Sequence, residues 1–173
     1  MTIKRLPLAG AVAAVAAASV VATTALAGGE REVRTRLTGF QEVPAVSTDA
    51  GGKFKARLRS SHEEIKYELS YSELTGAVQQ AHIHLGQRSV NGGISGFLCS
   101  NLGNGPVGTQ ACPAGPATIK GTIGPDDVVG PAVQGIDPMQ FEELVRAIRA
   151  GVTYANVHSA TFPGGEIRGQ LND

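Results

Sequence analysis

Hydrophobic and polar residues alternate along much of the chain, and this period of two predicts short β-strands. In residues 53–59 apolar side chains alternate with lysines and arginines, and residues 65–71 alternate in the same way after a polar turn at 60–64. These two segments predict an antiparallel hairpin with one charged, solvated face. Further short strands, separated by glycine-rich turns, are expected at 78–85, 94–99, 117–123, 152–159 and 166–171.

One segment has a helical period instead. Apolar residues at 141, 144, 145 and 148 fall on one helical face, with charged residues opposite. Asp137 and Pro138 suit the start of a helix, and Gly151 suits its end. The sequence therefore predicts an all-β domain, a Greek-key or immunoglobulin-like β-sandwich or small barrel, with one short amphipathic helix at about 138–150.

Composition agrees with a single turn-rich domain. The 173 residues include 23 Gly and 9 Pro, and 42% are hydrophobic, which is too many for a disordered chain. Lys plus Arg and Asp plus Glu number 15 each, so the chain lacks the basic excess typical of nucleic-acid-binding proteins.

The N-terminus has the pattern of a secretory signal peptide. Lys4 and Arg5 precede an uncharged run over residues 6–27, which ends in Ala25-Leu26-Ala27. We expect a signal peptide at 1–27, a lead-in at 28–33 and the domain at 34–173; a retained membrane anchor is the alternative. Cleavage predicts a secreted, periplasmic or cell-surface protein with no further membrane contact.

The two cysteines also relate to the compartment in which the protein is found. An oxidising compartment would allow Cys99 and Cys112 to pair across a loop poor in apolar side chains. The alternatives are two free thiols or two thiolate metal ligands. The disulfide is the prediction we carry forward.

Three of the four histidines are candidates for a metal site. His82 and His84 lie two positions apart on a predicted strand and so share one face. If the strand of His158 neighbours that strand, a third imidazole joins them, and neutral imidazoles suit zinc, copper, nickel or iron. The alternative is a structural polar cluster that hydrogen-bonds to backbone carbonyls. His62, in the predicted hairpin turn, is expected to be a solvated surface residue.

Polar neighbours of these histidines complete the candidate site. Glu166 follows the turn after His158 and is a candidate fourth ligand, or a group that orients an imidazole. Arg168 shares its face and is a candidate ion-pair partner, and Asn156 is a further candidate to support the ligands. The partner expected is a metal ion or an unidentified extracellular protein, not nucleic acid.

Other chemistries lack their motifs. The chain contains no nucleophile elbow of the G-x-S-x-G type, no phosphate-binding P-loop, no G-x-G-x-x-G opening a helix and no H-E-x-x-H. We therefore predict no catalytic residues.

Three sequence blocks resemble the CHRD (chordin) domain family. They are 37–46 (LTGFQEVPAV), 81–86 (AHIHLG) and the closing segments GVTYANVH and FPGGEIRGQL at 151–158 and 162–171. The resemblance implies an immunoglobulin-like β-barrel outside the cytoplasm, as in chordin, a modulator of bone morphogenetic proteins, and in many exported bacterial proteins. Because the cysteine-rich modules of chordin are missing here, growth-factor binding is not carried over.

The segment 82–86 also resembles the copper-binding H-x-H stretch of copper–zinc superoxide dismutase. The chain has too few histidines for the second, zinc site, and the copper site would be one imidazole short. A fold-level likeness does not confer an activity. The function expected is thus an exported binding or structural module that can carry a mononuclear copper or zinc site, with a superoxide-dismutase-like redox protein as the alternative.

Overall fold

The computed structural model describes residues 1, 30–59 and 62–172. The predicted signal peptide at 1–27 lies outside the described residues, apart from Met1. In the part that is described, no helix combines the length and the apolar character that crossing a membrane requires.

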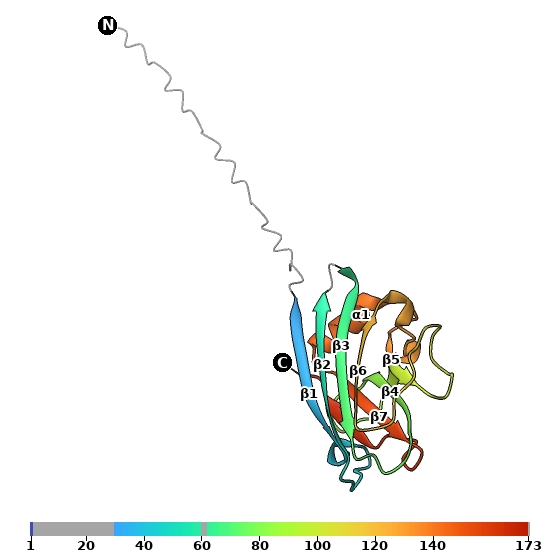
Figure 1. Cartoon of the computed structure of the whole chain (residues 1–173). Helices are drawn as coiled ribbons and strands as arrows, with labels where there is room; N and C mark the ends of the chain where they lie inside the picture. The colour runs from blue at the N-terminus through green and yellow to red at the C-terminus, as the bar shows by residue number, and fades with distance from the viewer. Residues whose placement is uncertain (2–29, 60–61, 173) are drawn as a thin grey trace.

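The domain is all-β with a single α-helix, as the sequence predicts (Figure 1). The predicted hairpin and the five other predicted strands are present to within one residue or two at their ends. The strands are β1 (Arg31–Thr38), β2 (Gly51–Arg59), β3 (Glu64–Ser72), β4 (Val78–Leu85), β5 (Gly93–Ser100), β6 (Ala117–Ile123), β7 (Thr153–Ser159) and β8 (Ile167–Gln170). The helix is α1 (Phe141–Arg149), and short 3-10 turns lie at Gly39–Gln41, Pro125–Asp127 and Ala132–Gln134.

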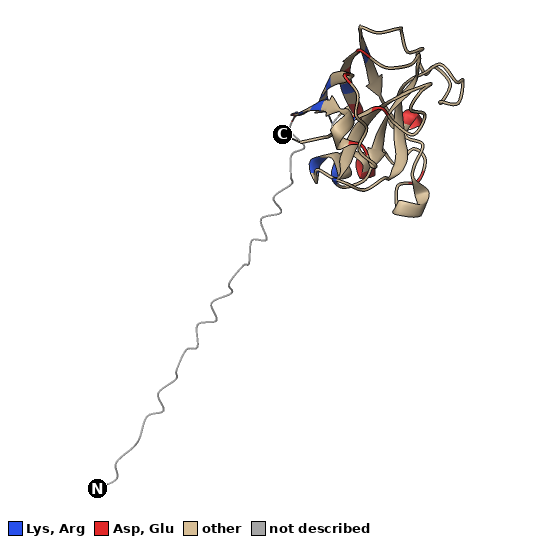
Figure 2. Cartoon of the chain, turned by 90° about the horizontal axis from the view of Figure 1, so that it is seen from below, with Lys and Arg blue, Asp and Glu red and all other residues tan. Residues whose placement is uncertain are grey.

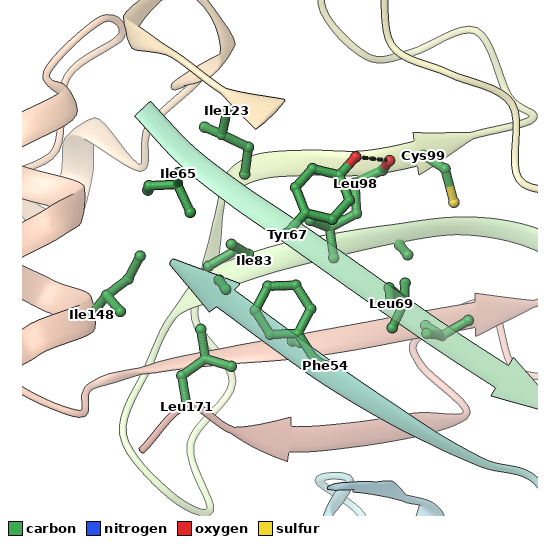
Figure 3. Packing of buried hydrophobic residues seen from close by; sticks show 14 of the residues in the cluster. Phe54, Ile65, Tyr67, Leu69, Ile83, Leu98, Cys99, Ile123, Ile148 and Leu171 are labelled. Atoms are coloured by element: carbon green, nitrogen blue, oxygen red, sulfur yellow. Dashed lines mark hydrogen bonds between the residues drawn. The ribbon is translucent and has the colours of Figure 1, made fainter. Parts of the chain in front are cut away.

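All strands join in one antiparallel sheet with the order β5-β4-β7-β8-β1-β2-β3-β6. The sheet curls so that its edges approach each other. Gly96 of β5 bridges to Val128 beyond β6, and the Tyr67 hydroxyl of β3 donates to the Leu98 carbonyl of β5 at 2.6 Å (Figure 3). The result is a nearly closed, barrel-like fold. One half, β5-β4-β7-β8, faces the other half, β1-β2-β3-β6, across the core.

The core lies between these halves. Figure 3 shows Phe54 and Leu69 from one half and Ile83 from the other converging on the same interior, with Ile148 of α1 at one side. Each of these side chains is no more than 1% exposed. Burying such residues is the main term that stabilises the fold.

The structure corrects two predicted boundaries. β1 begins at Arg31, so the last residues of the expected lead-in belong to the strand, because Val33 is buried in the core opposite Ala56. The helix begins at Phe141 and not near 138, because Met139 has a φ of 68° and cannot belong to a right-handed helix.

The predicted helix end is confirmed. Gly151 has a φ of 69°, and its N–H donates to the Ile148 carbonyl while that of Val152 donates to Ala147. This pair of hydrogen bonds is the Schellman motif, in which glycine tolerates the left-handed backbone.

The predicted disulfide is also confirmed. Cys99 of β5 is bonded to Cys112 in the following loop. The side chain of Asn101 reinforces the loop, since its amide group donates to the carbonyls of Val78 and Cys112 and accepts from the Cys112 N–H. The bridge therefore fixes a segment that has few apolar side chains of its own.

Candidate metal centre

Strand alternation places the histidines on the outer face of the sheet. On β4, Ala81 and Ile83 point into the core, so His82 and His84 point away from it. On β7, Val157 points inward and His158 outward. The predicted neighbourhood is present, because β4 and β7 are hydrogen-bonded partners with Gln80 opposite His158.

The three imidazoles meet at one point. One nitrogen from each ring lies within 4.8 Å of the others, a spacing compatible with a shared metal ion. The closest approach is 3.1 Å, between His82 Nδ1 and His158 Nε2. His82, His84 and His158 are all buried, with at most 7% of each residue exposed, although they lie outside the hydrophobic core.

Backbone carbonyls fix the orientation of two rings. His84 Nδ1 lies 3.0 Å from the Gly92 carbonyl, and His158 Nδ1 lies 3.0 Å from the Pro163 carbonyl. Because a carbonyl only accepts, each Nδ1 carries the proton, and each Nε2 keeps its lone pair. His82 Nδ1–H then donates to His158 Nε2, which leaves His82 Nε2 and His84 Nε2 buried without a partner.

Burial keeps these imidazoles neutral. It lowers the pKa of His82 to about 2, with a smaller contribution from the neighbouring histidines. It also lowers the pKa of His84 to about 4 and that of His158 in the same direction, although hydrogen bonds to backbone carbonyls oppose both shifts. Neutral imidazole is the form that binds metals, so the site needs no deprotonation at neutral pH.

Aromatic rings wall the cluster. His82 meets Phe97 edge-on with ring centroids 4.5 Å apart, and His84 stacks on Tyr154 at 4.8 Å. The guanidinium carbon of Arg168 lies 3.4 Å from the centroid of the Tyr154 ring. These contacts restrict the rotation of the imidazoles.

Glu166 is not part of this group of donors. Its Oε1 accepts hydrogen bonds from the Thr48 hydroxyl at 2.9 Å and from the N–H and hydroxyl of Thr75 at 2.8 Å each. Burial would raise its pKa, but hydrogen bonds from Ser159, Thr75 and Thr48 outweigh that effect and lower it. The structure thus places Glu166 in a link between loops. Among the described residues, the group of donors close enough together to hold a metal ion consists of His82, His84 and His158.

Arg168 does not pair with Glu166 either. It donates to Asn91 Oδ1 and to the carbonyls of Gln87 and Val90, in the loop between β4 and β5. That loop supplies the Gly92 carbonyl that orients His84. Arg168 therefore supports the histidine cluster indirectly, through the loop and through Tyr154.

Asn156 holds a carboxyl group beside the cluster. Its amide donates to Glu42 Oε1 at 2.6 Å and to the Ile167 carbonyl at 2.9 Å. Burial raises the pKa of Glu42 to about 7, against smaller opposing effects of Asn156 and Arg168. Glu42 and the carbonyls of Gly92 and Pro163 were not predicted, because only the fold brings these loops to the sheet. Tyr154 lies four positions before His158 on the same predicted strand, so strand alternation alone could have placed it on the same face as His158.

The fold and the site define a class: an all-β, disulfide-bonded, barrel-like domain with a buried trio of histidines on its wall. The family model of the CHRD domain matches residues 33–171, and the chain belongs to that family. This confirms the resemblance in the sequence blocks. No curated protein and no solved structure matches the chain significantly. CHRD domains are typically extracellular or periplasmic, and the disulfide fits such a compartment.

Proposed function

We propose that this CHRD domain is an exported binding module that holds one transition-metal ion, copper or zinc, through His82, His84 and His158. The observation that carries the proposal is the convergence of three buried imidazole nitrogens within 4.8 Å of one another. Histidines on an exposed surface can lie close together without consequence, because water satisfies their nitrogens. Buried histidine nitrogens need a partner within the protein or a bound ligand, so a buried cluster is the stronger evidence for a site.

The unpartnered nitrogens give the proposal its physical reason. His82 Nε2 and His84 Nε2 have no hydrogen-bond partner among the described residues. Leaving a buried acceptor unsatisfied costs about 1–3 kcal/mol. A metal ion bound by the cluster would use these two free lone pairs, and it would replace His82 Nδ1–H as the partner of His158 Nε2.

The donor set indicates which ions to test. Imidazole nitrogen suits zinc and copper, and divalent copper binds a given nitrogen site more tightly than divalent zinc. Hard cations such as Mg²⁺ and Ca²⁺ prefer oxygen ligands. We expect Cu²⁺ to bind more tightly than Zn²⁺, and Mg²⁺ not to bind at this site.

Calorimetric titration of the metal-free domain tests the site. The His82→Ala/His84→Ala variant should lose at least about 100-fold in affinity for Zn²⁺, because two of three ligands are gone. His62→Ala, which removes the exposed histidine, is the matched control and should bind like the wild type. Equal affinity in the wild type and the double variant would refute the proposal. His158→Phe, which keeps the ring in place, provides a second variant in case the double substitution unfolds the domain.

Export rests on the sequence pattern at 1–27 and on the compartment that the disulfide fits. Mass spectrometry of the protein recovered from its native host should give a mature chain that begins at Gly28. A chain that retains residues 1–27 would show that the segment is an anchor. No feature of the described residues favours the superoxide-dismutase-like alternative, and superoxide consumption by the copper-loaded protein is its direct test.

A further inference from the structure

A second surface, far from the histidines in the strand order, concentrates positive charge. It is the outward face of β1, β2, β3 and β6, which we call the basic face. Figure 2 shows the lysines and arginines gathered on one side of the domain, near the C-terminus. The cations of the basic face are Arg34, Arg36, Lys53, Lys55, Arg57, Arg59, Lys66 and Lys120, against the acids Glu32, Glu64 and Glu68.

Most of these charges are paired with one another. Glu32 contacts Arg34, Lys55 and Arg57. Glu64 contacts Arg59 and Lys66, and Glu68 contacts Lys120. The chain as a whole has a formal charge of zero, so the excess of cations here is a local feature.

Arg36 and Lys53 are the exception. Neither forms an ion pair with any described residue, and the register of β1 and β2 sets them directly opposite each other. Like charges in directly opposed positions of neighbouring strands destabilise a sheet. An anion bound between them would convert this repulsion into attraction.

The surface is hollowed on both sides of this pair. A depression of about 570 Å³ is bordered by Arg36, Lys53, Gly51 and Thr118. A second depression, of about 440 Å³, is bordered by Arg36, Lys53, Lys55 and Glu68, and Lys120 neutralises that carboxylate. Gly51 lies in the outward row, and only one heavy atom, the Leu37 carbonyl oxygen at 3.9 Å, lies near the position of its missing Cβ, so the hollow is open there.

We propose that the basic face binds an acidic polysaccharide, with Arg36 and Lys53 contacting its carboxylates. The hydroxyls of Ser70, Ser72 and Thr118 border the hollows and suit the hydroxyl groups of sugars. Binding at this surface is independent of the metal site, because the two lie on different halves of the sheet.

Two other polyanions fit the basic face less well. The large exposed hydrophobic residues in the described part of the chain lie outside these four strands, so the face has no side chain to insert into a bilayer. Single-stranded nucleic acid is bound through aromatic stacking, and the outward residues of these strands include no aromatic one.

The test is calorimetric titration of the disulfide-bonded domain with polygalacturonate oligomers at low ionic strength. We expect Arg36→Gln/Lys53→Gln to weaken binding by roughly tenfold. Arg59→Gln/Lys66→Gln removes the same charge from the same face and spares the hollows, because neither these residues nor their ion-pair partner Glu64 borders them, and it should weaken binding by no more than about twofold. Binding by the wild type should also fall steeply on addition of about 0.5 M salt.

Three results would overturn the proposal. The wild type could fail to bind the oligomers, or the two double variants could lose affinity equally, which would indicate a general charge effect. Tighter binding to phosphatidylglycerol vesicles or to oligo-dT than to polygalacturonate would assign the basic face to a membrane or to nucleic acid. Metal affinity is measured on the same variants and should be unchanged, so that a failure here leaves the metal proposal to its own test.

Discussion

The outer faces of the two halves of the barrel are both polar, yet they are built in opposite ways. On β1-β2-β3-β6 the outward side chains are charged and largely exposed; Arg34, for example, has 72% of its side chain exposed. On β4-β7-β8 most of the outward side chains are buried, and Arg168 is only 2% exposed. The same strand alternation thus yields a solvated surface in one half and a covered polar layer in the other.

The difference comes from the loops. Segments 39–50, 86–92 and 160–166 contribute Glu42, the Gly92 carbonyl and the Pro163 carbonyl to the face of β4-β7-β8. Burying polar groups is unfavourable unless each finds a partner. Most of the groups in this layer have one. The exceptions are His82 Nε2, His84 Nε2, Glu166 Oε2 and Gln170 Oε1, and of these the two imidazole nitrogens belong to the histidine cluster.

Matched arginine substitutions give the largest expected contrast. Arg168→Ala removes three hydrogen bonds and the contact with Tyr154, and should lower the free energy of unfolding by about 3 kcal/mol. Arg34→Ala should change it by less than about 0.5 kcal/mol, because exposed ion pairs contribute little. Urea denaturation of the metal-free variants measures both values. Similar losses from the two substitutions would show that the covered layer is not a distinct region.

Lowering the pH from 7 to 5 should give the second-largest effect, a loss of free energy of unfolding that arises from the buried histidines of the covered half. The unfolded chain takes up protons on histidine below the ordinary pKa of 6.5, whereas folded His82 and His84 do not until pH falls to about 2 and about 4. Their joint contribution to stability falls by about 4 kcal/mol between pH 7 and pH 5 in the metal-free protein. His158 acts in the same direction.

Glu42 opposes this loss. Its pKa is about 7 in the fold and 4.5 ordinarily, so the folded state takes up the proton first and gains about 2 kcal/mol over the same pH interval. Urea denaturation at pH 7 and pH 5 should therefore show a steeper loss in Glu42→Gln than in the wild type. A loss of equal size in the two proteins would contradict the assigned directions.

The sequence predicted the fold well where local pattern decides structure. Strict alternation located β2 and β3, and the spacing of apolar residues by three and four positions in 141–148 located the helix face. The start of the helix was wrong, because Asp137 and Pro138 resemble a helix N-terminus although Met139 turns the chain before the helix begins. Asp137 and Pro138 belong to a tight turn, in which the Gln140 N–H donates to the Asp137 carbonyl.

The candidate site was predicted only in part, for a physical reason. Two histidines on one strand share a face by geometry, and the third needed only the pairing of β4 with β7. The hydrogen-bond partners of Glu166 and Arg168 depend on which loops fold over the sheet. Loop conformation cannot be predicted from a sequence period, as a strand or a helix can. Glu166 meets Thr48 and Thr75, both far from it in the sequence, and no pattern indicated that contact.

The central claim, that three histidines bind one metal ion, is tested most directly by pulsed electron paramagnetic resonance of the Cu²⁺-loaded domain. The remote imidazole nitrogens modulate the signal once for each bound ring, so the spectrum reports the number of histidine ligands. We predict three in the wild type and two in His158→Phe, with His62→Ala unchanged. Fewer than three bound imidazoles in the wild type, or a spectrum that His158→Phe leaves unchanged, would contradict the account.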